Sequence, residues 1–224
     1  MVDNFCQISK LLHFENPGDC YWIQLLRRSN DDPSGLGKTN PKYHGKASKR
    51  TIASYFITSV NNFESLKEDI VKICDALNCR AYILLDKRNF EKMTKLMLVN
   101  ISEKIASNCF CSPAKIAFST AGIENSAKEK TWIVDIDKEY VPYVDGIKAA
   151  ICNSSEFSEP IIAEIKTKNG CHLITKKFNK KRFSECWVTY HDNRANFGYT
   201  VGDIPLNPPE IKSNSPTILY VPGE

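Results

Sequence analysis

Two aspartates separated by a single residue, Asp135 and Asp137, have the residue type and spacing of a possible metal site. They follow an apolar run at 132–134, whose last two residues, Ile133 and Val134, are β-branched. Because side chains alternate between the faces of a strand, both carboxylates should point the same way. Such a pair repels unless a proton or a cation lies between its members, and hard divalent cations prefer oxygen ligands. The pair therefore suggests a metal site, although it could simply end a strand and cap the next helix.

A histidine follows this pair at the end of a tight turn. The turn, residues 167–170, ends in Asn-Gly, a dipeptide that favours a two-residue hairpin between strands expected at 160–166 and 171–175. His172 lies on the returning strand, and Gly170 lets the backbone approach a ligand closely. His172 could face the aspartates and donate to a nucleotide phosphate, or it could simply be a half-buried strand residue.

A third acid, Glu210, precedes the last expected strand, 217–221, and lies in a segment at 210–212 that we interpret as a polar turn. Three carboxylates suit two Mg²⁺ or Mn²⁺ ions, which can clamp the attacking and leaving oxygens of a phosphoryl transfer. Asp192 and Asp203 are rival third ligands.

The elements that must position these residues alternate between strands and helices and end in the hairpin. This order indicates an α+β domain around a mixed or antiparallel sheet flanked by helices. We expect one domain over residues 1–224, with an N-terminal αβ unit at about 20–107 and a metal-binding unit at about 131–224. Further strands are expected at 20–26, 52–60 and 81–85, and helices at 63–77, 90–107 and 140–151.

Composition places few limits on function. A formal charge of +4 permits a nucleic-acid partner without requiring one. The 9 cysteines are irregularly spaced and lack the pairs expected of structural zinc. The first residues do not resemble a secretory signal, and no apolar run approaches the ~20 residues of a membrane span. We therefore expect a cytoplasmic protein with reduced thiols that does not interact with a membrane.

Three motifs together resemble the archaeo-eukaryotic primase superfamily, especially its primase-polymerase (prim-pol) branch in phages and mobile elements. Val134-Asp135-Ile136-Asp137 fits the first family motif, in which apolar residues and aspartates alternate. The second, a hairpin turn ending near a histidine, is matched by residues 167–172, with Thr167 in place of the usual serine. The third, an acid before a strand, is matched by 209–212 leading into 220–222, with Glu210 in place of aspartate. Residues 79–88 also resemble the strand that precedes the first motif.

The resemblance implies an RRM-like catalytic core that performs template-directed nucleotidyl transfer in DNA replication, in a phage-infected bacterial host or with a mobile element. Asp135, Asp137 and Glu210 would bind Mg²⁺ or Mn²⁺. Single-stranded DNA template and nucleoside triphosphates would be the partners, with a separate helicase because no phosphate-binding helicase motif is present. The incoming nucleotide would be bound by Thr167, Lys168, Gly170 and His172. Template or triphosphate would contact Arg27, Arg28, Lys87, Arg88, Lys176, Lys177, Lys180, Lys181 and Arg182.

Two other functions fit parts of the same sequence. Glu164-Ile165-Lys166 has the Glu-x-Lys spacing of metal-dependent nucleases, in which the lysine helps to activate water. With Asp135 or Asp137 it would form such a site, but His172 and Gly170 would then have no role. Alternatively, the chain could be a catalytically inactive nucleic-acid-binding replication module.

Overall fold

The chain folds into two compact units, each with its own sheet flanked by helices. The computed structural model describes residues 1–28, 49–110, 113–124, 127, 130–196 and 207–223. The first unit combines Met1–Lys128 with Ile218–Glu224, and the second is Glu129–Thr217. The expected α+β class with antiparallel, helix-flanked sheets is confirmed.

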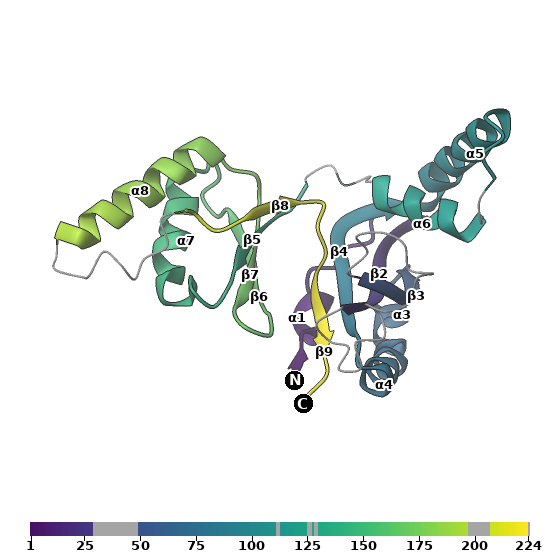
Figure 1. The fold of residues 1–224 in the computed structure, drawn as a ribbon, viewed down its shortest axis with the longest axis horizontal. Helices are drawn as coiled ribbons and strands as arrows, with labels where there is room; N and C mark the ends of the chain where they lie inside the picture. Colours follow the sequence, from purple (N-terminus) through teal and green to yellow (C-terminus); the bar gives the residue numbers. More distant parts are fainter. Residues whose placement is uncertain (29–48, 111–112, 125–126, 128–129, 197–206, 224) are drawn as a thin grey trace. The chain divides into compact units, whose positions relative to one another are not determined.

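The first unit contains a five-stranded sheet that joins the two ends of the chain. Its strand order is β1-β9-β4-β2-β3, and β1 pairs with β9 so that Val2 lies opposite Val221. We expected the last strand in the metal-binding unit, but it completes the sheet of the first unit instead (Figure 1). The strands are β1 (Val2–Asp3), β2 (Asp19–Arg28), β3 (Lys49–Ile57), β4 (Arg80–Asn89) and β9 (Thr217–Val221).

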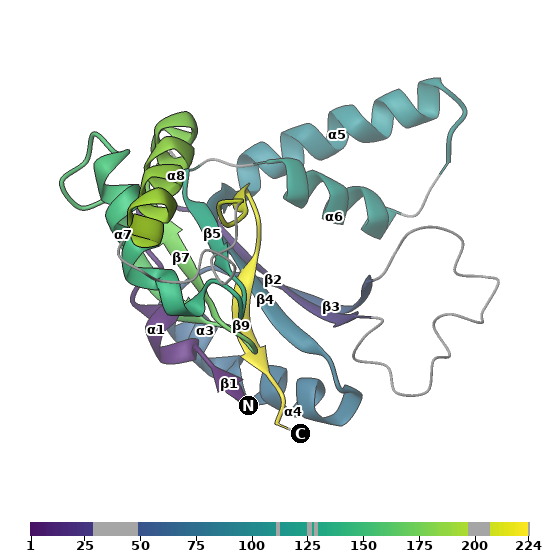
Figure 2. The same ribbon diagram turned by 60° about the vertical axis from the view of Figure 1, so that its left-hand side comes forward.

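The first unit's helices begin and end at recognisable caps. Asn89 caps α5 by accepting hydrogen bonds from the backbone N–H groups of Glu91 and Lys92, as its residue type favours. Ser59 caps α3. Figure 2 shows α5 beside α6, and both pack on the sheet through a cluster containing Trp22. The helices are α1 (Phe5–Ser9), α3 (Val60–Ser65), α4 (Lys67–Leu77), α5 (Phe90–Ala106) and α6 (Pro113–Ile123). None of the described helices has the length and apolar character needed to cross a bilayer.

The second unit has the order strand–helix–strand–strand–helix–strand. Its four-stranded sheet has the order β6-β7-β5-β8, and all neighbouring strands are antiparallel. This is the split βαβ arrangement of ferredoxin-like domains. Our expectation of a polar turn at 210–212 was wrong, because most of this segment is the edge strand β8. The elements are β5 (Trp132–Ile136), the 3₁₀ turn η2 (Val141–Tyr143), α7 (Val144–Asn153), β6 (Ile161–Lys166), β7 (Cys171–Thr175), α8 (Lys180–Asn196) and β8 (Ile211–Ser213).

Alternation along β5 and β7 separates the second unit's core from its polar residues. Val134, Ile136 and Leu173 are fully buried in a cluster with Ile147 of α7 and Trp187 of α8. Because side chains alternate, Asp135 and His172 must lie on the opposite face of the sheet.

Gly170 fixes the turn between β6 and β7 against the end of β5. A Cβ atom at this position would lie 1.9 Å from the backbone oxygen of Ile136. The Gly170 N–H donates to the Thr167 hydroxyl, 3.0 Å away, which closes the turn. We expected Gly170 to let the backbone approach a ligand, but the group that it approaches is the backbone of β5, the strand that carries Asp135.

We expect Gly170→Ala to lower the free energy of unfolding by about 1–3 kcal/mol, the usual effect of overpacking. The backbone of β5 must shift, because no flexible side chain is available to move. Urea titration measures the effect. Gly223→Ala is the control, since its Cβ would meet nothing closer than 3.7 Å. Equal stability of the two variants would contradict a tight approach of Gly170 to β5.

Candidate functional site

Three of the residues singled out in the sequence lie in one row across the second unit's sheet. Asp135 of β5 lies directly opposite His172 of β7. On the other side of β5, the Asp135 N–H donates to the backbone oxygen of Glu210 at 2.9 Å, just before β8 begins. The β5 pairings therefore align Glu210, Asp135 and His172 on the face opposite α7 and α8.

The carboxylate of Asp135 is bound from both sides. Its Oδ1 lies 3.3 Å from His172 Nε2, and its Oδ2 lies 2.5 Å from the Nζ of Lys212. The same Nζ is 3.0 Å from Glu210 Oε2. One ammonium group thus joins two of the three expected metal ligands.

These contacts stabilise the charged forms of the groups. The hydrogen bond from His172, and then that from Lys212, holds the pKa of Asp135 well below its usual range, although burial opposes the shift. Burial acts to lower the pKa of Lys212, but its hydrogen bonds to Asp135 and Glu210 outweigh it and raise the pKa. The site therefore keeps a carboxylate and an ammonium ion in contact at neutral pH.

His172 is held by a second polar partner. Its Nδ1 lies 2.8 Å from the hydroxyl oxygen of Thr217, which is fully buried. An ionised carboxylate can only accept hydrogen bonds, so Nε2 must donate to Asp135. In the neutral ring, Nδ1 is then an acceptor and the Thr217 hydroxyl donates to it.

Asp137 does not join this cluster. Strand β5 ends at Ile136 and Asp137 is exposed, so strand alternation no longer fixes its direction. Within the described residues, no three His, Cys, Asp or Glu side chains come together as metal ligands. The donor chemistry nevertheless suits a hard cation, because two carboxylates already share one positive charge, that of Lys212.

The remaining residues expected to bind nucleotide lie in the turn beside this row. Thr167 accepts a hydrogen bond within the turn, and Lys168 is exposed. The rival third ligands, Asp203 and the side chain of Asp192, lie outside the described part of the chain.

The expected nuclease pair lies on the wrong face of the sheet. Ile165 is opposite His172, so Glu164 and Lys166 point to the side away from Asp135. Glu164 instead pairs with Lys148 of α7 at 2.7 Å. The hypothesis of a nuclease site that combines Asp135 with Glu164 and Lys166 is therefore wrong.

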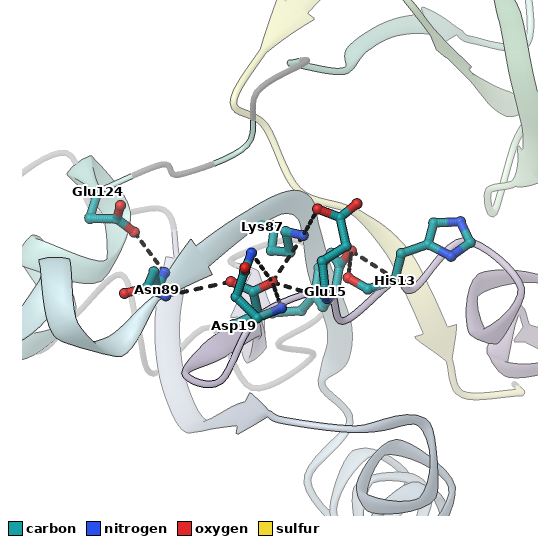
Figure 3. A network of polar contacts seen from close by, with 8 residues as sticks. His13, Glu15, Asp19, Lys87, Asn89 and Glu124 are labelled. Carbon is teal, nitrogen blue, oxygen red and sulfur yellow. Dashed lines mark hydrogen bonds and ion pairs between the residues drawn. The ribbon is translucent and has the colours of Figure 1, made fainter.

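In the first unit, Lys87 supports the local structure. Figure 3 shows it beside Asp19, with Nζ 3.0 Å from Asp19 Oδ2 and 3.4 Å from Glu15 Oε2. Burial acts to raise the pKa of Asp19, but the Lys87 contact and backbone donors outweigh it and lower the pKa to about 2. The same network continues through Asn89, whose backbone N–H donates to Glu124.

Two arginines expected to bind nucleic acid also have structural roles. Arg88 is fully buried, and its Nε donates to the backbone oxygen of Ala121 in α6. Since it has no exposed surface, our expectation of a nucleic-acid contact was wrong for this residue. Arg27 donates from Nε to Leu77 at the end of α4, 2.9 Å away. The side chain of Arg28 lies outside the described part.

The basic run of the second unit remains largely on the surface. Lys176 lies over the ring of Phe157, and Lys180 over the ring of Trp132, each 4.7 Å from the ring centre. Phe178 within this run is buried and packs as a core anchor. Four of these cations are exposed: Lys177, Lys180, Lys181 and Arg182.

Lys212 and Thr217 belong to the site but were not expected there from the sequence. Lys212 lies two residues after Glu210, a spacing that places both on one face only if the segment is extended. Because we expected a turn at 210–212, this spacing did not indicate that Lys212 lies beside Glu210. No local pattern connects Thr217 with His172, 45 residues earlier.

Comparison with known proteins adds no relative: no protein-family model, curated protein or solved structure matches the chain.

We expect Asp135→Asn to lower the free energy of unfolding by about 2 kcal/mol at pH 7, because charge-assisted hydrogen bonds to His172 and Lys212 are lost. The folded-state pKa of Asp135 is depressed, so its contribution is present above the unfolded-state pKa of about 3.9 and is lost as the pH falls below it. In urea titrations, the difference in the free energy of unfolding between wild type and Asp135→Asn should be smaller at pH 3 than at pH 7. Asp137→Asn is the control. If Asp135→Asn were destabilised equally at both pH values, this would contradict a depressed pKa of Asp135 in the folded state.

The neutral form of His172 should carry its proton on Nε2. Two-dimensional ¹⁵N NMR of the imidazole ring distinguishes the tautomers, and Nδ1 should give the signal of an unprotonated nitrogen. A ring protonated on Nδ1 alone would contradict the contacts with Asp135 and Thr217.

Proposed function

We propose that this chain catalyses metal-dependent, template-directed nucleotidyl transfer, as the primase-polymerases that it resembles do. The observation that supports this most is the row formed by Glu210, Asp135 and His172 on one face of a split βαβ sheet. The three motifs are far apart in the sequence, and their approach to one row is what a shared reaction centre requires.

In this proposal, Asp135, Asp137 and Glu210 hold Mg²⁺ or Mn²⁺. When bound, these ions would neutralise charge on the triphosphate and favour attack by a 3′ hydroxyl on its α-phosphate. The sheet aligns Asp135 and Glu210 through their backbones, so their positions do not depend on side-chain packing alone. Asp137, exposed beyond the strand, is left to orient when the substrate binds.

The turn and its histidine would bind the nucleotide. His172 Nε2 carries a proton that can be donated to a phosphate oxygen once it is released from Asp135. Lys168 is exposed on the turn, which Thr167 and Gly170 close through their hydrogen bond. Pyrophosphate would leave as the new phosphodiester bond forms.

The exposed cations of the second unit would bind single-stranded template. Four lysine or arginine side chains are grouped around the start of α8, where they can contact successive phosphates without reading sequence. A separate helicase would supply unwound DNA. We place this activity in phage or mobile-element replication in the bacterial cytoplasm.

The direct test is nucleotide incorporation on a primed single-stranded DNA template with Mg²⁺ or Mn²⁺, analysed on a gel. We expect Asp135→Ala combined with Asp137→Ala to reduce incorporation at least about 100-fold, as loss of transition-state charge stabilisation does. Lys166→Ala, which changes an exposed residue on the other sheet face, should retain activity. Unchanged incorporation by the double variant would refute the proposal, and template binding without any product would indicate an inactive binding module.

A second candidate, phosphodiester hydrolysis, is favoured by one specific contact set. Glu210-Ile211-Lys212 has the Glu-x-Lys spacing, and the Lys212 ammonium contacts both Asp135 and Glu210. The same gel distinguishes this activity, because labelled DNA would be cut without added nucleotides and Lys212→Ala would stop the cutting. This arrangement leaves His172 without a catalytic role, so we rank it second.

A further inference from the structure

The ammonium group of Lys212 lies where a metal ion between Asp135 and Glu210 would have to bind. Its Nζ is 2.5 Å from one carboxylate and 3.0 Å from the other. A divalent cation bound to these two oxygens would be in direct contact with the ammonium, and like charges at that distance repel strongly. Lys212 and a metal ion therefore cannot occupy this site together.

The strand geometry allows the lysine to leave without a backbone change. Lys212 lies opposite Ile133 on the edge strand β8 and reaches Asp135 diagonally, as long side chains can. About a third of the Lys212 side chain is exposed (33%), and most of the Glu210 side chain is exposed (70%). Rotation of its flexible four-carbon stem is sufficient to move the ammonium into solvent.

We propose that Lys212 is an exchangeable internal cation, which holds Asp135 and Glu210 together until Mg²⁺ or Mn²⁺ takes its place. This inference rests on the proposed function, because it uses the same two carboxylates as metal ligands. Displacing the lysine breaks two ion pairs, which weakens binding of a metal ion by itself. A nucleoside triphosphate that arrives with the metal offers the released ammonium a phosphate partner, so metal and nucleotide bind better together than separately.

The test is the affinity of the full chain for Mn²⁺ alone, measured by calorimetric titration without nucleotide. We expect Lys212→Met to bind Mn²⁺ at least about tenfold more tightly than wild type. The metal ion no longer has to break the two ion pairs of Lys212, and one charge-assisted contact alone corresponds to roughly that factor. Lys166→Met is the matched control, because it removes an exposed lysine from the other face of the same sheet. Its affinity for Mn²⁺ should equal that of wild type.

Thermal unfolding separates cation exchange from a purely structural role. In EDTA, Lys212→Met should unfold at a lower temperature than wild type, because the facing carboxylates lose their shared cation. Mn²⁺ should then raise the unfolding temperature of Lys212→Met more than that of wild type. Adding Asp135→Asn to Lys212→Met should abolish this response, which shows that it depends on Asp135.

Equal or weaker Mn²⁺ binding by Lys212→Met would overturn the inference, as would a loss of stability that Mn²⁺ does not restore. These results are independent of catalysis. A wild-type chain that incorporates no nucleotide, while Lys212→Met binds Mn²⁺ more tightly, would refute the proposed function and leave the exchange intact. Normal nucleotide incorporation by the wild-type chain, without tighter Mn²⁺ binding by Lys212→Met, would refute the exchange and leave the proposed function intact.

Discussion

The contact between Gly170 and the end of β5 sets the register on which the candidate site depends. With no side chain at Gly170, the turn lies directly against the backbone oxygen of Ile136. This places His172 opposite Asp135 and orients both toward the same face. A slip of one residue would put Cys171 or Leu173 beside Asp135 and turn the histidine into the core. The turn is therefore a geometric requirement of the site as well as a connection.

The electrostatics of the site follow from this register. Asp135 is largely buried, with 18% of its side chain exposed, and a charge in such a place needs partners. His172 and Lys212 supply them from the two neighbouring strands. In this state His172 donates to a carboxylate of its own chain. In the proposed function, a substrate phosphate would receive this hydrogen bond once another cation stabilises Asp135, which would couple nucleotide binding to cation binding.

Local patterns predicted several elements of both units. The strands at 171–175 and 217–221 have the expected bounds, and the Asn-Gly turn lies between β6 and β7, because alternation and turn chemistry are short-range properties. Long-range pairing was not predictable in the same way. Nothing within 217–221 indicates that it joins the sheet of the first unit, between strands that begin at Val2 and Arg80.

The errors within the site also have physical causes. Strand β8 has only three residues, too few for alternation to be recognised, so Lys212 was missed. Asp137 was expected beside Asp135, but the strand ends before it. Arg88 follows Lys87 in a charged run that suggests surface, yet packing of α6 buries it. For Lys212 and Arg88, the deciding contacts are with residues distant in sequence, Asp135 and Ala121.

The most direct test of the proposed metal and nucleotide site is the anomalous diffraction of Mn²⁺ in crystals grown with Mn²⁺ and a non-hydrolysable nucleoside triphosphate. We expect a manganese peak bound by Asp135 and Glu210, the Lys212 ammonium moved away from both carboxylates, and His172 in contact with a phosphate. A nucleotide bound elsewhere, with Lys212 still between the two carboxylates and no manganese beside Asp135, would contradict the proposal.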